Sequence, residues 1–431
     1  MRVLVFEPNY VGHNLAYVRH LMHGLGKLNC DPHFVTSVQS RESTEYQAQL
    51  GDLTDSFQTH AFEGFSSRAN RNGIRVNGFY GARAILHVLN EAIVRIKPHH
   101  LYIPFGNPVA NLLAYTNGVT NLIRRNNIET EIILLFGRYS IPQSSFLGRW
   151  KRHFSLSLLH RGPWFRIHHI LPFAVSTIQS FDPQLAAKTR LLPDPVTAPA
   201  PMSHQGACQK LGIPADGKYI SLLGVLEERK GIYQLLTAFE RALPELAARD
   251  RLLLAGRPCP QVALRLGTSW SHLLQSGRVV LIDRYLDNEE MDAALRASAT
   301  IATPYPRHQY SASIVIRAAA SQVPVIANSI GWMRDVVQRH QLGKSCETNN
   351  PEVFSQAIIE SFRHSGKPNP SAQRFAEFHS VPNFVAHITD RLSRRLKEPS
   401  LPSMSWQALL ESTEIVPSPQ HCPEKEKAVA A

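Results

Sequence analysis

Cysteine is scarce in this sequence, and no two of the cysteines form a Cys-x-x-Cys pair. The five are widely separated: Cys30, Cys208, Cys259, Cys346 and Cys422. Neither a metal site nor a disulfide scaffold follows from that spacing. Isolated cysteines are typical of a reducing compartment, so the sequence predicts a cytoplasmic protein with no bound metal.

Long apolar runs are also absent. No stretch approaches the roughly 20 apolar residues that a membrane-spanning helix requires. The apolar run at residues 3–6 is short and is followed by Glu7, which favours a buried strand over a signal peptide. We expect a cytoplasmic protein that at most lies on the inner face of a membrane.

Acidic residues are outnumbered by basic ones, 34 to 46, which gives a formal net charge of +12. The excess favours anionic partners: nucleic acid, an acidic membrane or phosphorylated substrates. The sequence has no zinc-ligand spacing, basic zipper or RNA-recognition signature, one of which a nucleic-acid reader would be expected to carry. We therefore predict no nucleic-acid partner.

A chain of 431 residues is too long for one ordinary hydrophobic core, which predicts two domains. Short apolar runs alternate with amphipathic segments, the pattern of parallel α/β sheets covered on both faces. The predicted strands are residues 3–6, 33–38, 101–103, 132–136, 171–178, 219–224, 251–255, 279–282, 300–303 and 324–327. Predicted helices include residues 82–96, 289–296 and 312–320.

Four prolines between residues 193 and 201 interrupt this alternation, because proline can neither continue a helix nor lie within a central strand. They indicate a linker. We predict a first domain at residues 1–190, the linker at 191–206 and a second domain at 207–370. A helix at 371–396 is expected to return to the first domain, and residues 397–431 are expected to form a disordered tail.

Two stretches of the second half carry the most chemical information. The first leads from Gly224 through an acidic loop to Arg229, Lys230 and Gly231, between a predicted strand and an amphipathic helix. The second runs from residue 303 to 313 and enters a helix of small residues, followed by a Pro-Val-Ile-Ala strand.

In order and spacing, residues 219–343 resemble the family 4 glycosyltransferases, whose GT-B fold has two Rossmann-like domains facing each other across a cleft. The first domain matches only in outline, through Gly12-His13 and the exit at Leu192-Pro193. The resemblance implies a metal-independent, retaining glycosyltransferase without a cofactor. Its donor would be a nucleotide-sugar, and its acceptor a glycan or a lipid-linked molecule.

The resemblance places Lys230, with Arg229, at the donor phosphates. Transfer leaves a nucleoside diphosphate with growing negative charge, which cations and helix N-termini stabilise. The hydroxyls and amides of Ser311 and Ser313 open a helix and are expected to meet phosphate oxygens. The alternative is that Arg229 and Lys230 form a solvated charge pair at a helix start.

Three positions depart from the family pattern. Val225 stands where an arginine is usual, and Gln309 and Arg317 replace two glutamates spaced eight residues apart. A guanidinium cannot accept hydrogen bonds from ribose hydroxyls. We interpret Arg317 as a cation for a phosphate or an acidic sugar, with pairing to a carboxylate such as Asp335 as the alternative. The missing glutamates also support a second function, a catalytically degenerate GT-B protein that binds a glycan or a partner.

Candidates in the first domain are fewer. Gly12 would let the backbone approach the donor, and His13 and Arg138 are candidate catalytic side chains facing the cleft. A histidine without a role and an exposed loop arginine are the alternatives.

A basic and aromatic stretch begins at Phe146 and continues beyond Phe154. A surface of this composition can dock on anionic lipid, which makes peripheral membrane contact one interpretation. An ordinary core helix with snorkelling cations is the other, and it is the one we favour from the sequence.

Overall fold

The computed structural model describes residues 1–10, 14–63, 79–115, 117–137, 139, 145–363 and 369–412. The chain forms two compact bodies. The first contains Met1–Pro199, Gln309–Arg317 and Ala376–Met404. The second contains Ala200–His308, Ala318–Phe375 and the segment that begins at Ser405. Each body is an α/β unit around one parallel sheet.

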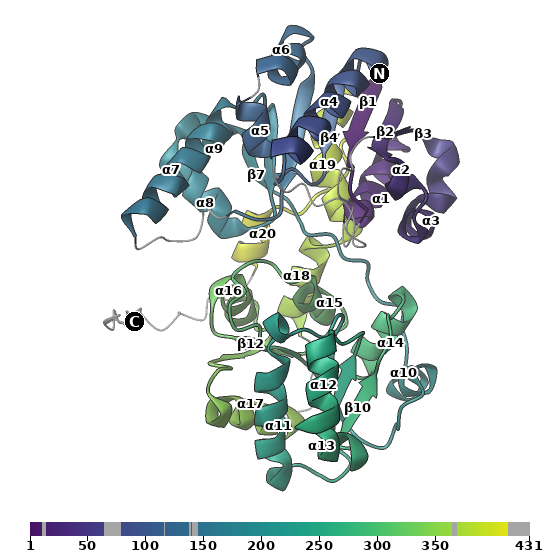
Figure 1. The fold of residues 1–431 in the computed structure, drawn as a ribbon, viewed down its shortest axis with the longest axis vertical. Helices are drawn as coiled ribbons and strands as arrows, with labels where there is room; N and C mark the ends of the chain where they lie inside the picture. The colour runs from purple at the N-terminus through teal and green to yellow at the C-terminus, as the bar shows by residue number, and fades with distance from the viewer. Residues whose placement is uncertain are drawn as a thin grey trace. The chain divides into compact units, whose positions relative to one another are not determined.

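The first body is built on a seven-stranded parallel sheet in the order β3-β2-β1-β4-β5-β6-β7 (Figure 1). Strand β1 lies between β2 and β4, so the direction of strand addition reverses there. The strands are β1 Arg2–Phe6, β2 Asp31–Ser37, β3 Gln58–Phe62, β4 His100–Ile103, β5 Glu129–Leu134, β6 Arg166–His169 and β7 Thr189–Leu191. Residues 3–6 are fully buried, as expected for a strand covered on both faces.

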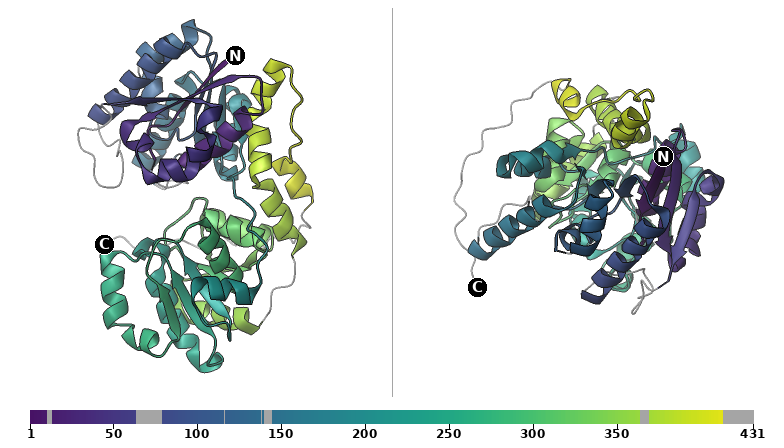
Figure 2. Two further views of the ribbon diagram at one scale, coloured as in Figure 1. Left: turned by 90° about the vertical axis from the view of Figure 1, so that its right-hand side faces the viewer. Right: turned by 90° about the horizontal axis from the view of Figure 1, so that it is seen from above.

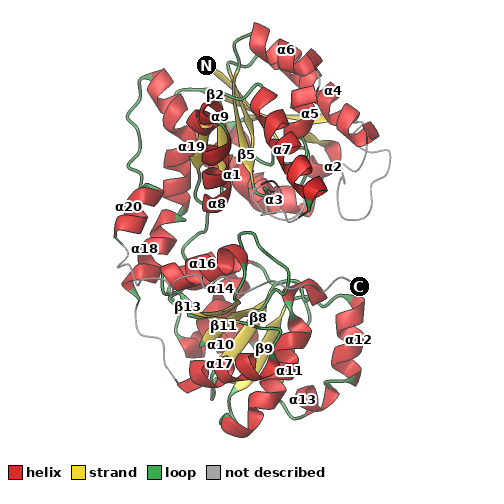
Figure 3. Cartoon of the chain, turned by 90° about the vertical axis from the view of Figure 1, so that its left-hand side faces the viewer, coloured by secondary structure: helices red, strands yellow, loops and turns green. Residues whose placement is uncertain are grey.

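Helices cover both faces of this sheet (Figure 3). They are α1 Asn14–Leu25, α2 Val38–Arg41, α3 Thr44–Leu50, α4 Phe79–Ile96, α5 Ala110–Tyr115, α6 Asn117–Arg125, α7 Phe146–Arg161, α8 Pro172–Phe181, α9 Pro183–Lys188 and α19 Val381–Leu396. A short 3-10 helix, η1 Gly51–Ser56, follows α3.

The late helix α19 belongs to the first body and lies beside α1 (Figure 2). The close approach depends on Gly24, where an added Cβ would lie 2.6 Å from Cγ1 of Val385. Arg391 donates to the Glu129 carboxylate at 2.8 Å, and the Tyr102 hydroxyl donates to the Ile388 carbonyl at 3.2 Å. These contacts bind α19 to α1 and to the first sheet.

The second body has a six-stranded parallel sheet in the order β10-β9-β8-β11-β12-β13. Its strands are β8 Tyr219–Leu223, β9 Arg251–Ala255, β10 Val279–Ile282, β11 Thr300–Thr303, β12 Val325–Asn328 and β13 Gly343–Cys346. Its helices are α10 His204–Leu211, α11 Ile232–Ala242, α12 Pro260–Thr268, α13 Ser271–Gln275, α14 Asn288–Ala297, α16 Gly331–Arg339, α17 Pro351–Arg363 and α20 Trp406–Glu411, with 3-10 turns at η3 Glu228–Lys230 and η4 Leu243–Glu245. Helix α15 Ser313–Ala320 starts in the first body and ends in the second, and helix α18 Pro370–Phe378 starts in the second and ends in the first.

The predicted fold class is confirmed: both halves are Rossmann-like, with parallel sheets and helices on both faces. None of the helices that the structure describes is long and apolar enough to cross a membrane.

The prediction of a strand at residues 171–178 is wrong, because this segment forms helix α8. Pro172 occupies the first turn, where a missing N–H breaks no helical hydrogen bond. Ala174 and Ile178, four residues apart, are the buried positions, which is the period of a helix and not of a strand.

The prediction of a disordered tail from residue 397 is wrong for residues 406–411, which form α20. The Ser405 side chain accepts a hydrogen bond from the Ala408 N–H and so caps this helix, and Leu409 is fully buried. The ring of Trp406 contacts that of His340. Residues 413–431 lie outside the described residues.

Candidate functional site

The loop after β8 lies at the point where the strand order of the second sheet reverses. Strand β8 has β9 on one side and β11 on the other. In open α/β sheets, ligands bind at the carboxyl ends of strands next to such a reversal. The loops that follow β8, β9 and β11 are therefore the first place to look for a ligand site in this body.

Glycines let these loops approach one another closely. Gly224 has a φ of 80° and Gly256 a φ of 142°, both in the region that favours glycine. The Gly224 N–H donates to the Ala255 carbonyl at 2.8 Å. A Cβ on Gly256 would lie 2.3 Å from the Gly224 carbonyl oxygen, so no larger residue fits.

The Lys230 side chain turns back beneath Gly224. Its ammonium donates to the Leu223 carbonyl at 2.8 Å, and the residue is only 8% exposed. Burial lowers the pKa of Lys230 to about 8, and the neighbouring Arg229 charge adds to that decrease. No carboxylate of the described residues lies within ion-pair distance of this ammonium. A buried ammonium with no carboxylate at ion-pair distance is unfavourable by itself, which indicates a site prepared for an anion.

The loop after β11 packs directly against the start of α11. Gly231 has a φ of 76°, and a Cβ at this position would lie 2.9 Å from Cγ of Pro304. The Pro304 carbonyl accepts from the Thr348 hydroxyl at 2.8 Å, and the Tyr305 carbonyl accepts from the Asn328 amide at 3.3 Å. This loop is thus held in place next to the Lys230 segment.

Arg229 is in a different environment from Lys230, although the two are adjacent in sequence. Its side chain is 61% exposed and donates to the Glu227 carboxylate at 2.6 Å. An exposed ion pair of this kind contributes little to stability. The alternative interpretation from the sequence was a solvated pair of charges at the helix start. The exposed Arg229 fits that interpretation, whereas the buried Lys230 does not. A role for either in donor binding stays a prediction.

Ser311 belongs to the first body, where its hydroxyl donates to the Asp194 carboxylate at 2.9 Å. The other oxygen of Asp194 accepts from the Tyr17 hydroxyl at 2.7 Å. Gln309, Ser313 and Arg317 are half-buried in the same body. The carboxylate proposed as an alternative partner for Arg317, that of Asp335, accepts from Arg334 at 2.7 Å.

Replacing Ser311 with alanine tests what its hydroxyl does. Because the hydroxyl is engaged with a buried carboxylate, we expect Ser311→Ala to lower the free energy of unfolding by about 1 kcal/mol. Nucleotide affinity should change less than about threefold, which corresponds to about 0.65 kcal/mol, because the hydroxyl binds Asp194 and not the nucleotide. Denaturant unfolding and calorimetric titration measure the two quantities. A tenfold weakening of nucleotide binding would show that the hydroxyl serves phosphate, as the sequence predicted.

Three of the predicted site residues, Gly12, His13 and Arg138, lie outside the described residues. Asp194 was missed, because the proline-rich segment was interpreted only as a linker. A carboxylate between two prolines was the available signal.

Glu7 was also missed as a site residue. It follows β1 at the strand-order reversal of the first sheet and is 1% exposed. Burial raises the pKa of Glu7 to about 8, against hydrogen bonds from Asn9 that lower it. Its Oε1 accepts from the Asn9 N–H at 2.9 Å, and its Oε2 is buried. Glu7 is therefore a neutral acid at pH 7, at the edge of the sheet where ligands bind.

The raised pKa of Glu7 predicts a pH-dependent stability. In the unfolded chain a glutamate ionises near pH ~4.3, whereas folded Glu7 stays protonated up to about pH 8. The folded state then binds more protons between these values, so its stability falls as pH rises. Because one pKa unit corresponds to about 1.4 kcal/mol, we expect Glu7→Gln, which cannot ionise, to gain roughly 3–4 kcal/mol of stability relative to the wild type between pH ~5 and pH ~8. Urea unfolding at both values measures this, and an equal difference at both would contradict it.

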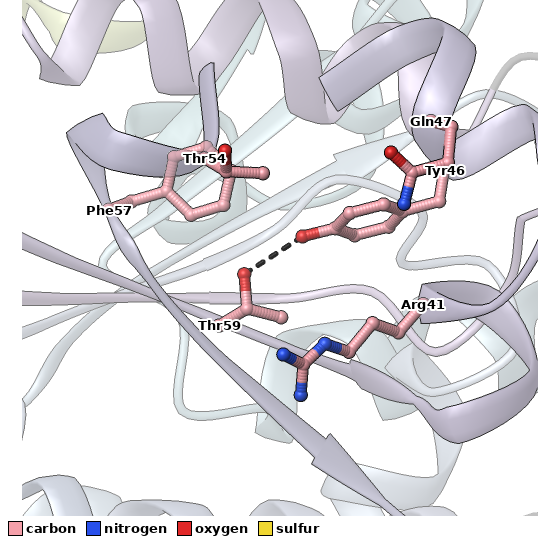
Figure 4. Close-up of a pocket in the computed structure, with 6 residues that line it drawn as sticks. All are labelled: Arg41, Tyr46, Gln47, Thr54, Phe57 and Thr59. Carbon is pink, nitrogen blue, oxygen red and sulfur yellow. Dashed lines mark hydrogen bonds between the residues drawn. The ribbon is translucent and has the colours of Figure 1, made fainter. Parts of the chain in front are cut away.

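A hollow on the first body lies between α2, α3, η1 and β3 (Figure 4). The Tyr46 hydroxyl and the Thr59 hydroxyl are 2.9 Å apart in it. The Arg41 guanidinium beside the hydroxyls of Tyr46 and Thr59 suits a ligand that carries an anionic group. None of the residues predicted for the donor lines this hollow, whose wall consists of Arg41, Tyr46, Gln47, Thr54, Phe57 and Thr59.

A family model supports the assignment of the second body. Residues 217–364 match the model described as "Glycosyl transferases group 1". This segment runs from β8 to α17 and includes the loop that carries Lys230. Among curated protein sequences, none matches this chain.

Solved structures resemble the chain over nearly its whole length. Sucrose-phosphate synthase from Thermosynechococcus elongatus matches with a TM-score of 0.66 at 16% identity, covering 92% of this chain and 99% of that one. Anabaena HepE in complex with UDP gives 0.65 at 12%, covering 91% and 100%. UDP-GlcNAc 2-epimerase from Methanocaldococcus jannaschii gives 0.57 at 10%, also covering 91% and 100%. At these identities the likeness establishes the fold. The chain has a GT-B fold, as its motifs predicted, and its segment 217–364 is similar to the group 1 glycosyltransferases.

Proposed function

We propose that this protein is a retaining glycosyltransferase that moves a sugar from a nucleotide-sugar to a glycan or a lipid-linked acceptor. We further propose that it needs no metal ion or other cofactor, and that it acts in the cytoplasm. The observation that carries the proposal is Lys230, a buried cation without a carboxylate partner among the described residues, at the strand-order reversal of the second sheet. The family match covers this same segment.

The chemistry of transfer explains why such a cation is needed. As the bond between the sugar and the diphosphate breaks, negative charge accumulates on the leaving phosphate oxygens. A preorganised ammonium in a site that excludes water stabilises this additional charge in the transition state more than it stabilises the intact nucleotide-sugar. A charged hydrogen bond of this kind contributes about 1.5–3 kcal/mol.

A uridine nucleotide is the first donor to test. The solved structures of Anabaena HepE include complexes with UDP and with UDP-glucose. These share the GT-B fold with this chain but little of its sequence, so the base and the sugar are proposals here.

Arg317 is proposed as a second cation for the donor. It lies on α15, which begins directly after the loop of small residues, and it occupies the position of a family glutamate. Replacement of Arg317 by alanine with no change in donor affinity would reject this role.

The departures at Val225, Gln309 and Arg317 favour a second candidate, a degenerate GT-B protein that binds a glycan or a partner without turnover. Val225 is 49% exposed and offers no charge to a phosphate. The purified chain should be incubated with UDP-, GDP- and ADP-sugars and assayed for released nucleotide. Release above that of a Lys230→Met variant supports transfer, whereas a nucleotide-induced thermal shift with no release supports binding alone.

A further inference from the structure

The two halves of α7 have opposite environments. In its second half, Leu156, Leu158 and Leu159 are buried and attach the helix to the first body. In its first half the large apolar side chains face solvent: Phe146 is 74% exposed, Leu147 67%, Trp150 55% and Phe154 41%. The interpretation of this segment as an ordinary core helix therefore holds only for its second half.

The exposed apolar side chains form one stripe. A helix turns by about 100° per residue, so Phe146, Trp150 and Phe154 share a face, and Leu147 lies within that arc. The rings of Trp150 and Phe154 stack with centroids 5.3 Å apart, which joins them into one surface. A contiguous exposed apolar surface on a soluble domain is unfavourable in water and usually marks an interaction site.

Basic residues flank this stripe. Residues 132–181 contain six arginines and lysines and no aspartate or glutamate. On the helix, Arg149 lies on one side of the stripe and Lys151 on the other, by the same 100° geometry. An apolar stripe between cations is the arrangement of helices that lie in the plane of an anionic bilayer surface.

We propose that the first half of α7 docks on an anionic lipid bilayer, with Phe146, Leu147, Trp150 and Phe154 inserted at the headgroup boundary. Arg149 and Lys151 then lie at the level of the lipid phosphates. The helix lies on the membrane and does not cross it. Charge complementarity favours this occupant, because cations flank the apolar stripe on both sides and α7 carries no acid that would oppose an anionic surface. The proposal does not depend on the proposed transferase activity.

Vesicle sedimentation of the full-length chain tests the proposal. One set of vesicles contains phosphatidylcholine alone and the other equal parts of phosphatidylcholine and phosphatidylglycerol. We expect sedimentation with the anionic vesicles only, decreasing as salt is raised. The double variant Trp150→Glu with Phe154→Glu should lose at least about tenfold in vesicle affinity, because it places charge in the apolar layer. Lys151→Glu should weaken binding less and reduce its salt dependence.

Leu264→Glu is the matched control. Leu264 is 68% exposed on α12 in the second body, so the substitution adds the same charge to another apolar surface position. It should leave vesicle binding unchanged, and far-ultraviolet circular dichroism checks that every variant is folded. Equal binding to both vesicle types, no binding to either, or wild-type binding by the double variant would each overturn the proposal.

Discussion

Replacing Lys230 with methionine is expected to lower kcat/KM for the nucleotide-sugar by about 10²–10³-fold, the loss typical of removing one donor that stabilises developing charge. Methionine keeps the length and apolar character of the buried stem and removes only the ammonium. In the wild type the Leu223 carbonyl accepts a hydrogen bond from Lys230 at 2.8 Å. In the variant this carbonyl loses that donor and accepts from solvent or a bound ligand instead. Steady-state kinetics and nucleotide titration on the same sample measure turnover and affinity.

The matched control is the adjacent residue. Arg229 carries the same charge, but its side chain is 61% exposed and is paired with Glu227. Arg229→Met should therefore change kcat/KM less than about fivefold. If the two variants behaved alike, the effect would come from general positive charge near the loop, and the specific role of Lys230 would be wrong.

A pH series tests how the charge of Lys230 affects both the stability of the protein and its affinity for the nucleotide. The folded pKa of about 8 lies below the usual lysine value, so the unfolded chain binds more protons between about pH 8 and 10. Stability of the free protein should then rise with pH in that interval, by up to roughly 3 kcal/mol. Nucleotide affinity should fall over the same interval as the ammonium loses its proton. Lys230→Met should lack both trends, whereas a trend that survives in the variant belongs to another group.

Replacing Gly256 with alanine is expected to lower the free energy of unfolding by about 3 kcal/mol or more. The φ of 142° is strained for any residue with a Cβ, and that Cβ would lie 2.3 Å from the Gly224 carbonyl oxygen. The neighbour in this clash is backbone, so it cannot move aside as a flexible side chain would. Relief requires separation of the loops after β8 and β9, which also moves the segment that carries Lys230.

Gly267→Ala serves as the control for Gly256→Ala. Gly267 lies within α12, and an added Cβ there meets nothing within 4 Å. Alanine in an exposed helix position should stabilise the protein by about 0.5–1 kcal/mol. Urea unfolding compares the two variants. A Gly256→Ala protein as stable as the wild type would show that the loops after β8 and β9 can separate without cost.

The strands of the second body were largely predictable. Those at residues 251–255, 279–282 and 300–303 coincide with β9, β10 and β11. Buried parallel strands are continuous apolar runs, and such runs are visible in the sequence. Strand β6 was not predicted because its residues are Arg-Ile-His-His, of which both histidines are buried. Strand β13 lies at the sheet edge and is largely exposed, so its sequence carries no apolar signal.

The candidate site was only partly predictable. The Lys-Gly pair after a glycine strand end identified Lys230, but sequence alone could not separate it from Arg229. Whether a side chain is buried depends on the surrounding loops, and the loops after β8, β9 and β11 come from distant parts of the chain. The hydrogen bond between Ser311 and Asp194 likewise joins residues 117 positions apart.

The sequence by itself determined two Rossmann-like halves and the loop that bears the phosphate-binding candidate, because apolar periodicity and glycine spacing are local properties of the chain. The tertiary structure alone decided which charges are buried. It placed Lys230 and Glu7 where water is excluded, left Arg229 and the first half of α7 in solvent, and thereby set the pKa values on which the predictions depend. The burial of a side chain depends on contacts with segments that are distant in the sequence, so it cannot be predicted from the residues next to it.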